Sequence, residues 1–127
     1  MTMQPDELKQ LRKSVGLSQG ELAGQLGLSQ GFIGEMERGE KPIEARTALQ
    51  IGQLLALQKL MNETVAARDG LLDDIANMEG AGPITTDRGH NVVPGVLGTM
   101  RARLERLNAA IEDGRNHYSV IERPAGD

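Results

Sequence analysis

The chain has 127 residues, of which 39% are hydrophobic and 25% are charged, and its formal net charge is −4. It has no cysteine and only two histidines, so disulfides and thiolate metal sites are excluded and we expect neither a metal site nor a cofactor. Phe32 and Tyr118 are the only aromatic residues. This argues against recognition of single-stranded nucleic acid by base stacking and favours a core of packed helices.

The charge is distributed unevenly along the sequence. Residues 1–62 hold seven basic and seven acidic side chains, whereas residues 63–127 hold seven basic and eleven acidic ones. The acidity therefore lies in the second half, and the first half is neutral. Affinity for a polyanion depends on where the cations sit rather than on the total charge. A neutral first half still predicts only modest non-specific binding.

The N-terminal sequence MTMQPDELKQ lacks the apolar core of a signal peptide. No apolar run approaches the roughly 18 residues that a membrane-spanning helix needs. We therefore expect a cytoplasmic protein that has no membrane partner.

The first half predicts short helices in succession. Residues 6–14 begin with two acidic residues and continue at helical spacing until Gly16 ends the helix. Ser18 followed by Glu21 is a capping box, in which each side chain satisfies a free amide at a helix start. A second helix is therefore expected to begin after Ser18.

A tight turn and a third helix follow. Gly27 can adopt the left-handed conformation that reverses the chain, and Ser29 caps the next helix, which ends at Gly39. Leu28 is expected to fill the corner. Two short helices joined by a glycine-containing turn are the layout of a helix-turn-helix, whose second helix enters the major groove of DNA.

The second half predicts two longer helices. Residues 44–79 are almost entirely helix-compatible, and residues 99–114 carry a short heptad seam. The segment between them, about residues 80–98, is rich in glycine and proline and is interpreted as a loop with short strand-like pieces.

We therefore expect an all-α protein in which a helix-turn-helix bundle precedes a long helix and a C-terminal helix. Residues 1–57 would form the DNA-binding domain, residues 58–121 a helical dimerisation or partner-binding region, and residues 122–127 a disordered tail. The apolar stripes of the two long helices would pair with a second copy. The expected dimerisation residues are Leu54, Leu57, Met61, Val65, Leu72, Ile75, Leu97, Met100, Leu104, Leu107 and Ile111.

The segment LRKSVGLSQGELAGQLGLSQGFIGEMERGEKP resembles the lambda-repressor-like, XRE-type helix-turn-helix family over about residues 5–57. The resemblance lies in the leading LRK, the GLSQxELA start of the second helix, the LGLS turn, the IxxxERG end of the third helix and the following proline. It implies binding to double-stranded DNA. It also implies a structural ion pair between Arg12 and Glu37.

The third helix carries the expected base-reading residues. Gln30 can pair with adenine, and Glu35 can accept from cytosine or repel phosphates in misregistered complexes. Phe32 can pack against a thymine methyl group or, equally, against the fourth helix. Gly31 and Gly34 permit close approach to the groove but supply no side chain, so the sequence code is expected to be sparse, with more weight on DNA shape.

Five further polar or basic residues are expected to contact phosphates, although an ordinary solvated position is the alternative for each of them. Gln19 lies at the positive end of the second helix, where the equivalent glutamine in similar proteins meets a phosphate. The other four lie at the start of the third helix and after its end. They are Ser29, Arg38, Lys41 and Arg46.

The function expected from these patterns is that of a transcriptional regulator, a homodimeric repressor of an inverted-repeat operator. The alternative is an antitoxin-type protein, or another protein whose second half binds a different protein. A ligand sensor has less support, because no polar cluster suggests a pocket. His90 with Asp87 and Arg88 marks a functional loop tip or, more simply, a solvated turn. An enzyme is disfavoured because no acid–base or nucleophile constellation is present.

Overall fold

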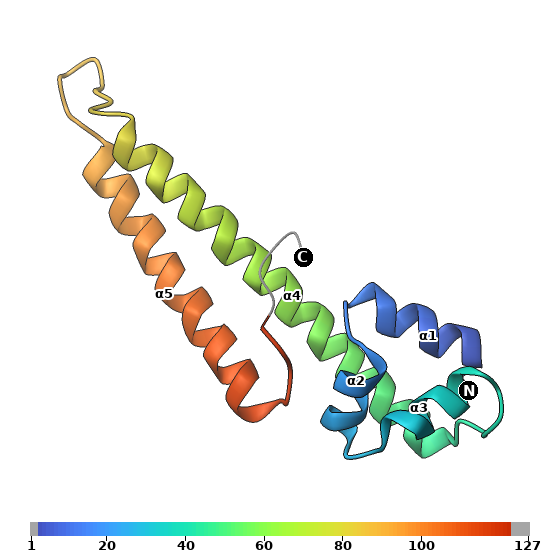
Figure 1. The fold of residues 1–127 in the computed structure, drawn as a ribbon. Coiled ribbons are helices and arrows are strands. Elements are labelled where there is room, and N and C mark those ends of the chain that lie inside the picture. The colour runs from blue at the N-terminus through green and yellow to red at the C-terminus, as the bar shows by residue number, and fades with distance from the viewer. Residues whose placement is uncertain (1–2, 123–127) are drawn as a thin grey trace. The chain divides into compact units, whose positions relative to one another are not determined.

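A computed structural model describes residues 3–122 of the chain (Figure 1). It contains five helices and, among the described residues, no strand beyond one isolated bridge between Thr85 and Asn91. The all-α class is therefore confirmed. The helices are α1 (Pro5–Ser14), α2 (Gln19–Leu26), α3 (Gln30–Glu37), α4 (Ala45–Gly80) and α5 (Val93–His117).

The described chain divides into two compact units. The first, here called the N-terminal unit, comprises the residues up to Leu60 together with Tyr118–Ile121. The second, here called the hairpin unit, comprises Met61–His117 and Glu122. Helix α4 contributes residues to both. No described helix is both long enough and apolar enough to cross a membrane.

The predicted caps define the helix boundaries of the N-terminal unit. Ser18 Oγ accepts a hydrogen bond from the amide of Glu21 at 3.0 Å, and the Glu21 carboxylate accepts from the amide of Ser18 at 2.9 Å. Ser29 Oγ accepts from the amide of Phe32 at 3.1 Å. Gly27 has a φ of +71°, so the chain reverses through a conformation that glycine adopts without strain. These caps confirm the starts predicted for α2 and α3.

The core of the N-terminal unit is aliphatic, as the composition predicted. One leucine differs from expectation: Leu28, expected to fill the corner, is 36% exposed. The turn is instead held through its backbone, because the amide of Leu28 donates to the carbonyl of Ala23 at 2.9 Å. The buried apolar residues of this unit are Leu8, Val15, Leu17, Leu22, Ala23, Ile33, Met36, Ile51, Leu54, Leu55 and Val120.

A buried glutamine ties the segment Tyr118–Ile121 to this core. Gln58 is fully buried on α4, donates through Nε2 to the carbonyl of Ile121 at 2.7 Å, and accepts through Oε1 from the amide of Ile121 at 2.9 Å. Val120, the preceding residue, is buried. The carboxamide thus pairs with both backbone groups of Ile121, and the segment completes the N-terminal unit.

The apolar seam of the second half is largely covered within the chain itself. In the hairpin unit, Leu71 and Ile75 of α4 pack against Leu97 of α5, where the two helices run alongside each other (Figure 1). Met100, Leu104 and Leu107, expected at a dimer interface, pack against this same cluster. Of the other expected dimerisation residues, Leu57 and Leu72 are exposed. Buried are Leu54, Met61, Val65, Ile75, Leu97 and Ile111.

The loop between the long helices is shorter than predicted, because α5 begins at Val93 and residues 93–98 are helical. Pro94 lies in the first turn, where a missing amide hydrogen leaves no bond unmade. Asn91 Oδ1 accepts from the amides of Val93 and Ile84, each at 3.2 Å, and so caps the helix start. The expected strand-like pieces reduce to the bridge between Thr85 and Asn91.

The expected disordered tail, residues 122–127, lies outside the described residues except for Glu122. This residue is half-buried, and its carboxylate pairs with Arg68 Nη1 at 3.0 Å and with Arg115 Nη1 at 3.2 Å. The hydrogen bond that Arg68 donates to Glu122 and the other interactions of Arg68 with carboxylates raise the pKa of Arg68. Glu122 therefore belongs to the hairpin unit, and the expectation of a disordered tail stays a prediction.

We expect Gln58→Ala to lower the free energy of unfolding by about 1–3 kcal/mol, because it leaves the Ile121 backbone groups without their partner inside the unit. Urea denaturation followed by circular dichroism measures the loss, and Tyr118 fluorescence reports on the segment itself. Gln50→Ala, at an exposed position of the same helix, should change stability by no more than about 0.5 kcal/mol. Equal effects of the two substitutions would contradict the role given to Gln58.

Candidate functional site

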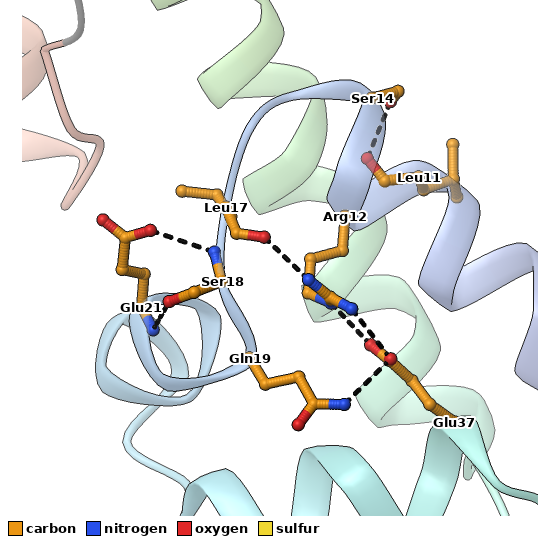
Figure 2. Close-up of polar contacts among 8 residues, drawn as sticks. All are labelled: Leu11, Arg12, Ser14, Leu17, Ser18, Gln19, Glu21 and Glu37. Atoms are coloured by element: carbon orange, nitrogen blue, oxygen red, sulfur yellow. Dashed lines mark hydrogen bonds and ion pairs between the residues drawn. The ribbon is translucent and has the colours of Figure 1, made fainter. Parts of the chain in front are cut away.

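A buried ion pair joins the end of α1 to the end of α3. Arg12 Nε donates to Glu37 Oε2 at 2.7 Å, and Arg12 Nη2 donates to Glu37 Oε1 at 3.0 Å (Figure 2). The remaining guanidinium nitrogen, Nη1, donates to the carbonyl of Leu17 at 2.8 Å. The exposed fractions of the two side chains are 9% and 3%. This is the framework pair that the family resemblance implied.

Glu37 also receives a hydrogen bond from the start of α2. Gln19 Nε2 donates to Glu37 Oε1 at 3.1 Å, as Figure 2 shows. Burial alone would raise the pKa of the Glu37 carboxyl, but the hydrogen bonds from Arg12 and Gln19 and the positive charge of Arg12 outweigh it and hold this pKa below its ordinary value. The carboxylate is therefore charged, and it fixes α1, α2 and α3 to one another.

The structure gives Gln19 a framework contact in addition to its expected phosphate contact. Its side chain is half-buried, and one of its amide hydrogens is directed to Glu37. A carboxamide nitrogen has a second hydrogen, so the contact with Glu37 does not exhaust its donors. Ser29, also expected at a phosphate, uses its hydroxyl oxygen to cap α3.

The expected base-reading residues differ in exposure. Gln30 and Gly31 are exposed at the first turn of α3, whereas Phe32 and Glu35 are half-buried. Gly34 is buried, although the helical spacing placed it on the outward face. The side-chain oxygen of Gln30 lies 3.4 Å from the point that a Cβ on Gly20 would occupy, so this side chain lies beside the start of α2.

Two side chains explain why Gly34 is buried. A Cβ on Gly34 would lie 2.9 Å from Arg38 Nη1 and 3.6 Å from Gln19 Oε1. Arg38 and Gln19, predicted separately as phosphate contacts, are therefore brought together over a residue that has no side chain. A guanidinium and a carboxamide therefore lie close together next to the N-terminus of α2.

The three basic residues after α3 are exposed, which fits both a phosphate contact and an ordinary solvated position, so the phosphate contacts stay predictions. The sequence reasoning overlooked the partner of one of them. Glu40 accepts two hydrogen bonds from Arg38, from Nε at 3.0 Å and from Nη2 at 3.1 Å. Gly39 lies between them with a φ of +76°. Lys41 and Arg46 have exposed side chains.

A glycine flanked by an arginine and a glutamate is the signal that could have revealed this pair. Within residues 3–122, no group of three or more histidine, aspartate or glutamate residues is arranged to hold a metal ion.

Comparison with known proteins gives one finding. A family model described as a helix-turn-helix domain matches residues 6–63. The searches of curated proteins and of solved structures found no match.

We expect Glu37→Gln to destabilise the protein by roughly 1–3 kcal/mol near pH 7, because the buried Arg12 loses its charged partner. Glutamate in an unfolded chain titrates near pH ~4.3. Because the pKa of Glu37 is lower than this in the folded state, its contribution is fully present above that pH and is lost as the pH falls through the folded-state pKa. The difference in the free energy of unfolding between the wild type and Glu37→Gln should therefore be smaller at pH 3 than at pH 7.

Urea denaturation at pH 7 and at pH 3 measures this difference in the free energy of unfolding. Glu63→Gln, at an exposed position of α4, serves as the control and should match the wild type closely at both. If this difference is as large at pH 3 as at pH 7, Glu37 does not stabilise the fold through its charge.

Proposed function

We propose, from the match of residues 6–63 to a helix-turn-helix family model, that the protein is a sequence-specific regulator that binds double-stranded DNA. In this proposal it acts as a homodimer and represses transcription from an inverted-repeat operator. The observation that carries the proposal is the fixed pose of α3. The Arg12–Glu37–Gln19 contacts hold this helix, whose first turn exposes Gln30 and Gly31.

The polar residues around α3 support a DNA-facing role for this surface. A DNA-binding helix-turn-helix places its second helix in the major groove, while flanking groups contact the backbone. Here the exposed Gln30 begins α3, and exposed basic side chains follow its end at Arg38, Lys41 and Arg46. Only a few side chains are available to reach base edges, so DNA shape is expected to carry part of the specificity.

Selection of DNA by the purified protein from a random double-stranded pool tests the function directly. We expect enrichment of an inverted repeat whose half-sites lie about 10 bp apart, one turn of the duplex. A promoter–reporter fusion carrying the selected site should be less active when the protein is present. The proposal fails if no sequence is enriched and no complex forms even at low salt.

We expect Gln30→Ala to cost about 1–3 kcal/mol of binding free energy and to relax specificity at one position in each half-site. The physical reason is the loss of two hydrogen bonds to one base edge. Lys41→Ala is the comparison variant and should weaken binding to all sequences alike, because a phosphate contact carries no sequence information. Binding-site selection with each variant measures both effects. If Gln30→Ala weakened binding to all sequences alike, α3 would lie in the groove in another orientation than the one proposed.

The homodimer needs a surface other than the seam inside the hairpin unit. A small helix-turn-helix domain reads few base pairs, so an inverted repeat requires two copies. In the N-terminal unit, Leu49 and Leu60 of α4 are 62% and 59% exposed. Leu49 borders an apolar groove of about 580 Å³ between α1 and α4, which Leu11, Gly52 and Ala56 also line. These exposed leucines supply apolar area for self-association.

We expect Leu49→Gln combined with Leu60→Gln to convert a dimer into a monomer and to weaken operator binding accordingly. Both side chains are largely exposed, so folding should be preserved. Light scattering measures the mass, and circular dichroism checks the helices. Ile84→Gln, at a loop residue that is 47% exposed, is the control and should leave the mass unchanged. A wild-type mass equal to one chain would overturn the dimer.

One observation favours the alternative, in which the hairpin unit binds a different protein. Ile84 and Val96 are 47% and 38% exposed beside a shallow hollow of about 460 Å³ that Met78 and Met100 also line. A stoichiometric second protein that co-purifies with the wild type, but not with Ile84→Asp, would favour this alternative.

A further inference from the structure

The Arg38 side chain folds back over α3. Arg38 is the residue that caps the end of this helix, yet its Nη1 lies 2.9 Å from the point that a Cβ on Gly34 would occupy, one turn earlier. An alanine at position 34 would push the guanidinium aside. The absence of a side chain at Gly34 therefore leaves room for the guanidinium of Arg38 beside Gln19, at the start of α2.

Glu40 holds the guanidinium in this place. Its two carboxylate oxygens accept from Nε and Nη2 of Arg38 at 3.0 Å and 3.1 Å, a two-pronged contact. The exposed fractions of the two side chains are 59% for Arg38 and 55% for Glu40. The pair is thus open to solvent and to any anion that approaches this surface.

A phosphate presents the same arrangement of acceptors as this carboxylate. Arginine forms two parallel hydrogen bonds with either group, so the two compete for one guanidinium edge. An exposed ion pair adds little to stability because water screens it. The exchange of the Glu40 carboxylate for a phosphate therefore meets little resistance from the fold.

We propose that Glu40 is an internal competitor for DNA phosphate. It occupies the Arg38 guanidinium in the free protein, and a backbone phosphate displaces it when α3 enters the groove. This inference rests on the proposed DNA binding and adds a residue that tunes it. Because the competition concerns a phosphate contact, Glu40 lowers affinity for every DNA sequence by a similar factor.

The test is a double-mutant cycle on DNA binding by the full chain, with the selected operator and a random duplex as probes. Glu40→Gln should raise affinity roughly two- to five-fold for both duplexes, as expected for the release of an exposed ion pair. Arg38→Ala should weaken binding to both duplexes and reduce the slope of log affinity against log salt by about one. In the Arg38→Ala background, Glu40→Gln should raise affinity no more than Glu44→Gln does.

Glu44→Gln is the matched control, because it removes the same charge from an exposed residue of the same connecting segment. It measures the general benefit of less negative charge near DNA. Thermal unfolding of each variant confirms that the fold is intact.

Three results would each overturn the proposal. The gain from Glu40→Gln could equal that from Glu44→Gln, its excess over the gain from Glu44→Gln could persist without Arg38, or Arg38→Ala could leave affinity unchanged. A wild-type protein that binds no double-stranded DNA would instead overturn the proposed function, and this inference with it.

Discussion

The buried contact between Arg12 and Glu37 is the constraint on which the rest of the N-terminal unit depends. One guanidinium bonds to the carboxylate at the end of α3 and to the carbonyl of Leu17 in the connection that precedes α2. A buried ion pair adds little net stability compared with an apolar pair, since both charges are removed from water. The pair instead fixes the geometry of the unit, because removing either residue would leave the other as an unpaired charge inside the unit.

The pose of α3 follows from this constraint. Glu37 is fixed by Arg12 and also accepts from Gln19, so the start of α2 is placed relative to the end of α3. That spacing brings Gln19 and Arg38 together over Gly34. A larger residue at position 34 would have separated them. The glycine that weakens α3 as a helix, by roughly 1 kcal/mol in propensity, thereby creates a place where a guanidinium and a carboxamide meet.

The sequence predicts those features that depend on a few neighbouring residues. The capping pair Ser18 and Glu21 and the left-handed Gly27 obey local rules, and the helices begin and turn where these rules place them. The pair of Arg12 and Glu37 spans 25 residues and was available only through family resemblance. The position of the Arg38 guanidinium over Gly34 depends on how a long side chain folds back, which spacing along a helix does not determine.

The second half shows a different limit. A stripe of apolar residues every three or four positions predicts a helix correctly, but the same stripe fits a helix of its own chain or of a second copy. Leu104 and Leu107 illustrate this, since they pack within the hairpin unit. The sequence does not predict the start of α5, because Pro94 and its neighbouring glycines are typical of a loop, although proline also suits the first turn of a helix.

Gln58 carried a signal that sequence reasoning could have used. It lies four residues after Leu54 and three before Met61, on the buried side of α4. A polar residue at such a core position requires a partner, because an unpaired buried carboxamide is costly. Its partner is the backbone of Ile121, so four residues after α5 belong to the N-terminal unit. That unit is therefore not contiguous in sequence, and the segment that the helix-turn-helix family covers, residues 6–63, lacks one part of it. A fragment ending there would leave the buried Gln58 without the backbone groups of Ile121, so the N-terminal unit needs residues that follow α5 for its completion.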